Sequence, residues 1–465
     1  ERVLSEGRPL RRASALTAQL DDPNLLLEVE RAVARRQRGF LAPLRCVEAV
    51  RAAVELPFTK GLRRERELFV ELMMSPESKA QRHVFFAERE VAKVPDLPPD
   101  TPARPVKSAA LVGSAGAAEL TACFASAGIA LVRYATQDDF EELRGVDLLI
   151  EAEREDVTAK RELIARLDAI AGPTTIVASS ASFVGLDSLV SATSRPQNLV
   201  GMHFADSADG AKLLENVRGR ETASDVYATV MRLGKTLGKV AVPVRGLLSA
   251  RSFAQYLREA FVLVEEGASP EQVDSALQAF GFPAGPFAVL DRVGLDVVLQ
   301  GRNGLFDALS PRVSAMELLS LMAAHGRLGR RAAAGFYRYS GEESAPDPEI
   351  SEWIVQQSEQ RGITRRNIAD EEICERCWFV VVNDAARALD EGIAARPLDV
   401  DLIWIHGLGY PSYRGGPLFH SDQMGLRAVL DGIRRYGRRT EQEGWVPAPL
   451  LERLVEREQG FYSRS

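Results

Sequence analysis

Residues 109–118 decide the fold of this chain, and they read AALVGSAGAA. The apolar residues 109–112 have the length of a buried strand, and Gly113 then opens a turn that leads into a helix. A strand, a glycine turn and a helix in this order form the first unit of a sheet that has helices packed on its faces. We therefore expect an α/β domain to begin close to residue 108.

The same alternation of short apolar segments and helical stretches continues to Val244. The predicted strands are 109–112, 129–134, 146–150, 175–178, 198–202 and 240–244, and the helices between them include 158–170 and 224–237. Strands that alternate with helices are joined by crossovers, which make neighbouring strands parallel. The pattern predicts a doubly wound parallel sheet over this region.

Both flanks of this region are predicted to be helical. Residues 24–95 show helical spacing with many charges, and the proline-rich segment 95–105 then ends any helix and forms a linker. Beyond Arg245 the strand signal fades and a set of short motifs occurs twice. The motifs EEG at 265–267, GFP at 281–283, GP at 285–286 and GL at 294–295 reappear as DEG at 390–392, GYP at 409–411, GP at 416–417 and GL at 425–426. A repeat spaced by about 130 residues predicts two helical domains of one kind, packed on each other.

Composition narrows the class of protein. A chain of 465 residues, 46% of them hydrophobic, can bury several cores, and about three domains are expected. The net charge of −7 forms no basic stripe, which argues against nucleic acid and membrane surfaces as partners. Four cysteines in so long a chain predict a reducing compartment, and the C-terminal SRS is not a peroxisomal address, so we predict a cytoplasmic location. The first residue is Glu1, which suggests the downstream part of a longer polypeptide.

One histidine and one carboxylate stand out among the predicted strands. His203 lies at the end of segment 198–204, which reads NLVGMHF, and Glu215 follows two leucines on the segment that comes next. An imidazole beside a carboxylate can accept a proton near neutral pH, while the carboxylate fixes its tautomer and stabilises the imidazolium. The spacing alone leaves a purely structural role open for both residues.

The turn after the first predicted strand is related to G-x-G-x-x-G, the motif that binds a dinucleotide. In that motif the first glycine makes the tight turn, the second admits the pyrophosphate and the third packs the helix on the sheet. Here the expected cofactor residues are Gly113, Ser114, Ala115 and Gly116. Gly113 fits the first position, whereas Ala115 places a methyl group where the phosphate must approach. The motif also requires an acidic residue at the end of the second strand, where it binds the ribose hydroxyls, and no acid stands there. Arg133 near the end of this strand either binds a ribose phosphate or is a solvated surface charge.

Several motifs in a fixed order resemble the L-3-hydroxyacyl-CoA dehydrogenase family. They are DLLIEA at 147–152, ASSAS at 178–182, GMHF at 201–204, LLE at 213–215, GFPAGPF at 281–287 and GFYRY at 335–339. The fuller resemblance is to multifunctional fatty-acid oxidation enzymes, in which an enoyl-CoA hydratase/isomerase part of the crotonase type precedes the dehydrogenase. Residues 41–95 are similar to the helical linker between those parts, so the resemblance covers essentially the whole chain.

This resemblance implies a Rossmann-like fold, NAD as the cofactor and an acyl-CoA thioester as the substrate. It implies that His203 removes the proton of the 3-hydroxyl group and that Glu215 orients His203. Ser182 matches the serine that contacts the substrate hydroxyl, although a turn serine that caps the backbone has the same signature. Glu151 and Lys160 match positions near the cofactor, and both could equally be surface charges.

The resemblance also implies a division of the chain into four parts. Residues 1–100 would contain the end of the crotonase part and the helical linker, and residues 101–244 the Rossmann-like dinucleotide-binding domain. Residues 245–345 would form the first helical dehydrogenase domain and residues 346–465 its repeat. The expected partner is then the upstream crotonase domain.

Three departures from the family predict an impaired dehydrogenase. The helical half of the family begins with a pattern that resembles G-F-x-x-N-R, but residues 246–251 read GLLSAR, so Ala250 replaces an asparagine that contacts the substrate. Losing one such polar group typically costs about 3 kcal/mol of transition-state stabilisation. The cofactor turn is altered, and only the short segment 136–145 stands where the family has a helical lid. The nominal reaction is oxidation of L-3-hydroxyacyl-CoA to 3-oxoacyl-CoA, and the alternative is a non-catalytic scaffold for an upstream hydratase.

Overall fold

The structure of the chain is a computed structural model. It describes residues 24–113, 117–136, 140–153, 156–180, 185–205, 212–300, 315–440 and 443–463, with positions 14, 16, 18–20, 22 and 138. The chain divides into two compact units, one made of Glu1–His83 with Ser412–Gly415 and the other of Val84–Pro411 with Gly416–Ser465. Helix α5 (Pro76–Glu90) begins in the first unit and ends in the second.

The first unit contains charged helices, in agreement with the helical spacing of residues 24–95. They are α2 (Leu25–Arg36), α3 (Ala42–Glu55), α4 (Phe58–Met74) and the start of α5. An ion pair of 2.6 Å between Arg45 and Glu71 joins α3 to α4. Gly39, with a φ of 87°, leaves room for the ring of Tyr413, which would collide with a Cβ at that position. This contact explains why residues 412–415 belong to the first unit.

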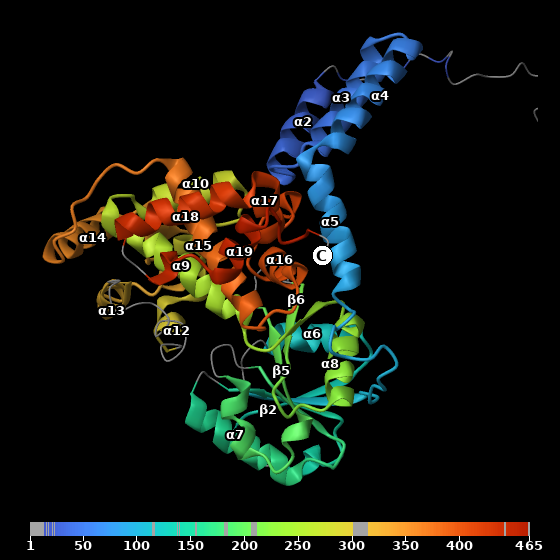
Figure 1. The fold of residues 1–465 in the computed structure, drawn as a ribbon, viewed down its shortest axis with the longest axis vertical. Coiled ribbons are helices and arrows are strands. Elements are labelled where there is room, and N and C mark those ends of the chain that lie inside the picture. Colours follow the sequence, from blue (N-terminus) through green and yellow to red (C-terminus); the bar gives the residue numbers. More distant parts are fainter. Residues whose placement is uncertain are drawn as a thin grey trace, which may run out of the picture. The chain divides into compact units, whose positions relative to one another are not determined.

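The second unit begins with a seven-stranded sheet (Figure 1), whose strands follow the order β2-β1-β3-β4-β5-β6-β7. The strands are β1 (Ser108–Gly113), β2 (Ala130–Tyr134), β3 (Leu148–Ala152), β4 (Ile176–Ser179), β5 (Leu199–Phe204), β6 (Leu213–Val217) and β7 (Val240–Val244). The expected α/β fold is confirmed, but the sheet is not wholly parallel, because β5 and β6 are antiparallel. Residues 205–212 between them are too few for a crossover, so β6 returns in the opposite direction.

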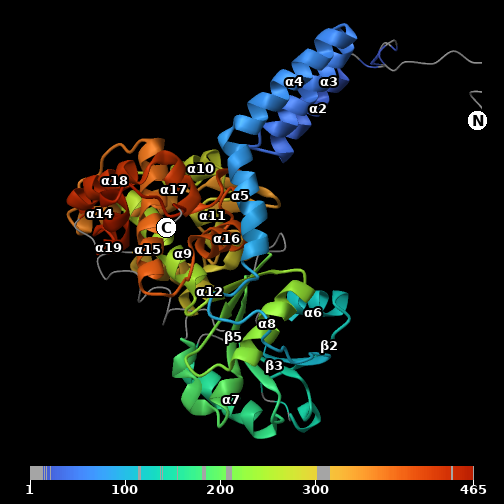
Figure 2. The same ribbon diagram turned by 45° about the vertical axis from the view of Figure 1, so that its right-hand side comes forward.

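Helices cover both faces of this sheet (Figures 1 and 2). Helices α6 (Ala117–Ser126) and α8 (Ser224–Thr236) contribute to the core on one face, and α7 (Val157–Ile170) packs on the other. Side chains alternate between these cores, since Leu111 lies in the first and Val112 in the second. Strands that are covered on both faces consist of continuous apolar runs, which is why residues 109–112 could be recognised in the sequence.

Beyond β7 the chain forms two groups of helices. The first contains α9 (Leu248–Glu266), α10 (Pro270–Phe280), α11 (Pro286–Val293), α12 (Leu295–Gln300), α13 (Ala315–Ala324) and α14 (Pro348–Gln360). The second contains α15 (Asp370–Asp390), α16 (Pro397–Gly407), α17 (Pro417–Met424), α18 (Leu426–Thr440) and α19 (Pro449–Glu456). The first group also holds a hairpin of β8 (Tyr337–Ser340) and β9 (Glu343–Pro346), which the sequence patterns did not predict. Strand β9 is exposed along its whole length, so it has no apolar alternation that could have marked it.

The two groups are copies of one structure, as the repeated motifs predicted. In the first copy Asp274 on α10 accepts hydrogen bonds from the backbone amides of residues 287 and 288, at 3.0 and 2.9 Å. In the second copy Asp401 on α16 does the same for the amides of residues 418 and 419, at 2.8 and 3.1 Å. A carboxylate that binds the first amides of a helix caps it and interacts favourably with its dipole. Each copy therefore fixes its second helix to its third through a buried aspartate.

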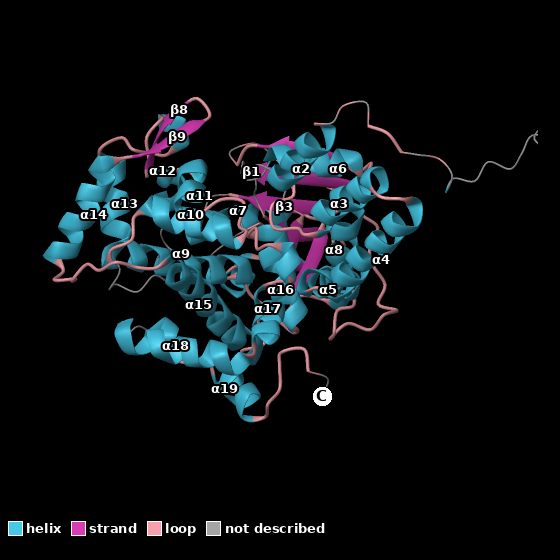
Figure 3. Ribbon diagram, turned by 90° about the horizontal axis from the view of Figure 1, so that it is seen from above, coloured by secondary structure: helices cyan, strands magenta, loops and turns pink. Residues whose placement is uncertain are grey.

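Helices α9 and α15 pack side by side where the copies meet (Figures 1 and 3). Arg251 on α9 bonds to Asp384 on α15 at 2.8 Å, and Arg376 on α15 bonds to Glu259 on α9 at 2.6 Å. Each residue of the first contact is separated from its counterpart in the second by 125 positions (251 to 376, and 259 to 384). The interface is thus isologous within one chain, as in a symmetric dimer.

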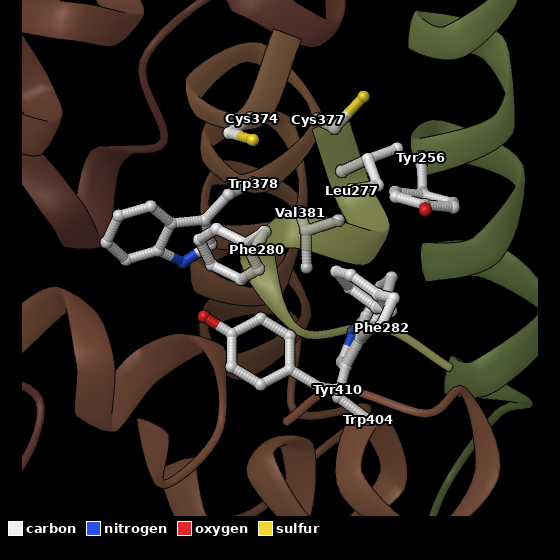
Figure 4. Close-up of a pocket in the computed structure, with 10 residues that line it drawn as sticks. All are labelled: Tyr256, Leu277, Phe280, Phe282, Cys374, Cys377, Trp378, Val381, Trp404 and Tyr410. Atoms are coloured by element: carbon white, nitrogen blue, oxygen red, sulfur yellow. The ribbon is translucent and has the colours of Figure 1, made fainter. Parts of the chain in front are cut away.

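Aromatic side chains from both copies line a small pocket at this interface (Figure 4). Its lining residues are Tyr256, Leu277, Phe280, Phe282, Cys374, Cys377, Trp378, Val381, Trp404 and Tyr410. The rings make edge-to-face contacts, such as the one between Tyr256 and Trp404 with centroids 5.8 Å apart. Burial raises the pKa of the Cys377 thiol, so this cysteine is held in its unreactive form.

Candidate functional site

His203 and Glu215 lie opposite each other on adjacent strands. In the antiparallel pair of β5 and β6, His203 is in register with Glu215. Residues directly opposite in such a pair share one face of the sheet, with Cβ atoms about 4.5–5.5 Å apart. Leu199 on β5 and Leu213 on β6 share that face and belong to the core that includes the helical copies. The two residues that stood out in the sequence are therefore neighbours on the face toward the helices.

Glu215 is completely buried at the N-terminus of α9. Its Oε1 accepts hydrogen bonds from the amides of Leu248 and Ser249, at 3.0 and 3.1 Å, and its Oε2 accepts one from the Ser249 hydroxyl. Burial raises the pKa of the Glu215 carboxyl, while the charge of His203 and these hydrogen bonds oppose that rise. The helix amides and the positive end of the helix dipole favour the ionised carboxylate. The sequence analysis did not identify Ser249 as a site residue. The feature that could have identified it is a hydroxyl side chain at the start of the helix that follows β7.

Two glycines permit close packing around this pair. A Cβ at Gly201 on β5 would lie 2.7 Å from the Cβ of Val217 on β6. A Cβ at Gly407, the last residue of α16, would lie 2.4 Å from Cδ2 of Leu213. Helix α16 therefore packs directly on β6, and the second helical copy supports the strand that carries Glu215.

A second polar cluster lies on the same side of the sheet. Glu151, in register with Ser179 on β4, accepts hydrogen bonds from Lys160 Nζ at 2.9 Å and from the Ser179 hydroxyl at 2.6 Å. The side chains of Glu151 and Lys160 are fully buried, so the alternative that they are surface charges is wrong. Lys160 Nζ also donates to the carbonyl of Glu153 at 2.8 Å. Such a buried pair keeps the end of β3 in one geometry, because removing either partner leaves an uncompensated charge.

The C-terminal ends of β1 and β3 form the switch point of the sheet. The connection from β1 leads to β2 on one side, and the connection from β3 leads to β4 on the other, which leaves a crevice where ligands bind in such folds. Gly113 at the end of β1 has a φ of 115°, and a Cβ there would lie 2.3 Å from the carbonyl oxygen of Ala152. Only glycine fits this turn.

Several expected site residues lie outside the described part of the chain. They are Ser114, Ala115 and Gly116 of the cofactor turn and Ser182, the expected substrate contact. Arg133 near the end of β2 is exposed. The described part of the connection from β2 to β3 contains a short turn of 3-10 helix, Glu141–Leu143.

The described residues offer neither a membrane span nor a metal centre. Over that part of the chain, no helix is both long and apolar enough to cross a bilayer. Nor do three His, Cys, Asp or Glu side chains gather there as metal ligands.

Comparison with known proteins establishes the family. Residues 108–247 match the family model of the 3-hydroxyacyl-CoA dehydrogenase NAD-binding domain. Residues 246–339 and 373–461 match the model of the 3-hydroxyacyl-CoA dehydrogenase C-terminal domain, once in each helical copy. The chain belongs to the 3-hydroxyacyl-CoA dehydrogenase family.

Individual relatives narrow this assignment. The chain is 34% identical over 517 residues to the peroxisomal bifunctional enzyme of Danio rerio, covering 97% of this chain and 71% of the relative. It is 33% identical to the Homo sapiens enzyme of the same name, covering 90% of this chain and 66% of the relative. The solved dehydrogenase part of multifunctional enzyme 1 from C. elegans is 25% identical, with a TM-score of 0.58 over 80% of this chain and 96% of that one. The chain thus corresponds to the dehydrogenase part of a multifunctional β-oxidation enzyme.

These comparisons bear on two expectations. The predicted cytoplasmic location is wrong, because the fish and human relatives are named peroxisomal enzymes. The expectation of NAD as the cofactor of the family is supported by the match of residues 108–247 to an NAD-binding domain.

Proposed function

We propose that this chain oxidises the 3-hydroxyl group of an L-3-hydroxyacyl-CoA to a ketone, with NAD as the oxidant. The observation that carries this proposal is the register of His203 with the buried carboxylate of Glu215 on adjoining strands. Family membership supports the reaction class, since both dehydrogenase domains match.

In this proposal His203 is the base. One ring nitrogen accepts the hydroxyl proton, while Glu215 binds the other ring nitrogen, fixes the tautomer and stabilises the imidazolium. The hydroxyl loses its O–H proton to His203, the carbon loses its hydrogen as a hydride, and a C=O bond forms. The proton then passes from His203 to water. Ser182 is proposed as a contact to the substrate oxygen.

The switch point supports NAD as the ligand of the neighbouring crevice. Gly113 makes the tight turn that a dinucleotide motif requires of its first glycine. Ser114, Ala115 and Gly116 are proposed to meet the pyrophosphate, and the buried pair of Glu151 and Lys160 to support this edge. When bound, NAD would accept the hydride.

We further propose that the rate is reduced relative to family members that keep the asparagine. Ala250 is the third residue of α9 and directly follows Ser249, so the lost amide belongs beside the carboxylate of Glu215. The proposed partners are an acyl-CoA thioester and a crotonase domain upstream in the same polypeptide, with domain limits at residues 100, 244 and 345.

The test is NADH formation by the purified chain with L-3-hydroxybutyryl-CoA and NAD, with the D isomer as the control substrate. Turnover with the L isomer that His203→Gln removes is the expected result. NADH binding is measured separately by fluorescence in wild type and His203→Gln, and is expected to be equal in both. If millimolar NADH gives no signal and the L isomer is not oxidised, the chain is a non-catalytic scaffold and the proposal is wrong.

A further inference from the structure

The Ser249 hydroxyl forms a hydrogen bond to Glu215 that has no role in the proposed mechanism. It donates to Oε2 of Glu215, while the amides of residues 248 and 249 bind Oε1. We propose that Ser249 is a positioning residue, whose hydroxyl holds the Glu215 carboxylate ionised and oriented toward His203. The catalytic consequence rests on the proposed function, whereas the effect on Glu215 does not.

The hydrogen-bond count at Glu215 supports this role. A carboxylate offers about four acceptor sites, two on each oxygen. The two helix amides occupy Oε1, and the Ser249 hydroxyl occupies one site on Oε2. Oε2 retains one site, which suits a single N–H donor such as the imidazole of His203 in register on β5. Without the hydroxyl, Oε2 would lose the bond that selects this orientation.

Because the site is buried, this hydrogen bond is important for keeping the Glu215 carboxylate ionised. The Glu215 side chain is fully buried and Ser249 is only 5% exposed, so water is excluded from stabilising the ionised carboxylate. Hydrogen bonds to a charged group are worth roughly twice those between neutral groups. The hydroxyl therefore opposes the rise in the pKa of Glu215 that burial causes.

Few other charged groups pack around Glu215 that could stabilise its ionised carboxylate. His203 on β5 is the neighbour whose positive charge, when the imidazole is protonated, lowers the pKa of Glu215. On α9 the nearest charged residue along the helix, Arg251, is ion-paired with α15. On α16, which packs on β6, His406 is paired with Glu88 at 2.9 Å. On β7 the residue in register is Val242.

The experiment compares two serines on one helix. Ser252 is also buried on α9, but its hydroxyl lies 3.3 Å from Asp384 on α15. Ser249→Ala is expected to lower kcat about tenfold at neutral pH and to move the acidic limb of the kcat/KM profile up by about one pH unit, with KM unchanged within twofold. Ser252→Ala is expected to keep wild-type kcat within twofold and to leave the acidic limb in place. Ser249→Thr, which retains the hydroxyl, is expected to restore kcat to within about threefold.

A second readout does not need turnover. Because the pKa of Glu215 is raised in the folded chain, its contribution to stability is complete below the unfolded pKa of roughly 4.3 and is lost as pH rises through the folded pKa. Removing the Ser249 hydroxyl raises that folded pKa further. The Tm of Ser249→Ala should therefore fall further below that of wild type as pH rises above the unfolded pKa of roughly 4.3. A Glu215→Gln background should remove the difference.

The outcomes separate this inference from the proposed function. If wild type does not turn over but Ser249→Ala differs from wild type in the dependence of Tm on pH, the proposed reaction fails and the role of Ser249 toward Glu215 stands. If turnover occurs and Ser249→Ala keeps both the pH profile and the Tm dependence of wild type, Ser249 does not position Glu215. Equal losses of kcat in Ser249→Ala and Ser249→Thr would also overturn the inference.

Discussion

The two helical copies share their internal design, but they meet the sheet in different ways. In the first copy, α9 begins on Glu215 and gives it two amides and a hydroxyl. In the second, the equivalent helix α15 begins with an acidic turn that contains Asp370, Glu371 and Glu372. The second copy reaches the same strand through α16, where Gly407 allows contact with Leu213. The first copy supplies polar contacts to the candidate site, and the second supplies packing behind it.

The reciprocal ion pairs between the copies differ in burial. The side chains of Arg376 and Glu259 are 1% and 0% exposed, whereas those of Arg251 and Asp384 are 27% and 5% exposed. The pairing recurs at equivalent positions, but one pair is enclosed and the other reaches solvent through Arg251. Loss of the arginine should therefore cost less at the second pair, because water reaches Arg251 and the buried Asp384 keeps a hydrogen bond from the Ser252 hydroxyl.

The largest expected effect distinguishes the candidate site on the sheet from the second copy that packs behind it. His203→Gln removes the proposed base and should lower kcat about 10³-fold. His406→Gln, a matched change beside the same sheet, should keep kcat within about threefold, because His406 pairs with Glu88 and not with Glu215. Steady-state NADH formation measures both. Equal losses would mean that His203 contributes to structure and not to chemistry.

The next prediction tests the difference in burial between the ion pairs. Arg376→Met leaves Glu259 buried without its partner and should lower the free energy of unfolding by about 3–5 kcal/mol. Arg251→Met should cost less, about 1–3 kcal/mol, because Arg251 is partly exposed and the buried Asp384 keeps a hydrogen bond from the Ser252 hydroxyl. Urea unfolding at neutral pH measures both variants. A larger cost for Arg251→Met would contradict the burial argument.

The next prediction concerns a feature that the two copies share, the aspartate that caps the third helix of each copy. Asp274→Asn and Asp401→Asn each leave a backbone amide facing an NH₂ group, and each should lower the free energy of unfolding by about 1–3 kcal/mol. Urea titrations of the two variants should agree within about 1 kcal/mol. A cost confined to one variant would mean that the copies do not share this cap energetically.

The stability of the protein should depend on pH through Asp274. Burial raises the pKa of Asp274 to about 6, so its contribution to stability is complete below the unfolded value and lost as pH rises through about 6. Asp274→Asn should therefore flatten the loss of wild-type Tm between about pH 4 and pH 6. A wild-type Tm that rises steadily through this window would contradict the raised pKa of Asp274.

The substitution with the smallest predicted effect restores a polar side chain at the start of the first copy. Ala250→Asn should raise kcat by about tenfold, because an amide at this position can contact the reacting oxygen. In a His203→Gln background the gain should vanish, which serves as the control. A gain that persists without His203 would place the effect of the amide elsewhere.

Much of the architecture could be predicted, for reasons visible in particular segments. Residues 109–112 and 199–202 lack polar side chains because helices cover both faces of their strands. The motifs GFP and GYP recur because both copies turn between helices in the same way. The candidate pair of His203 and Glu215 was recognised because ionisable residues are rare in such apolar strands. Each of these patterns lies within one short segment, so it can be recognised without knowledge of the tertiary structure.

Other features depended on contacts between distant segments. The burial of Glu151 with Lys160 and the hairpin of β8 and β9 have no local pattern that specifies them. The bond from Ser249 to Glu215 joins residues on different elements that no spacing rule connects.

By itself, the sequence determined the class of fold, the duplication of the helical half and the identity of the candidate base and carboxylate. It did so because periodicity and residue type follow directly from burial on each element. Tertiary structure alone decided that Glu215 is sealed beneath the start of α9 and that the second copy packs behind its strand. Those facts depend on which elements meet in space, and the balance between burial and hydrogen bonding that sets the charge of Glu215 exists only after they have met.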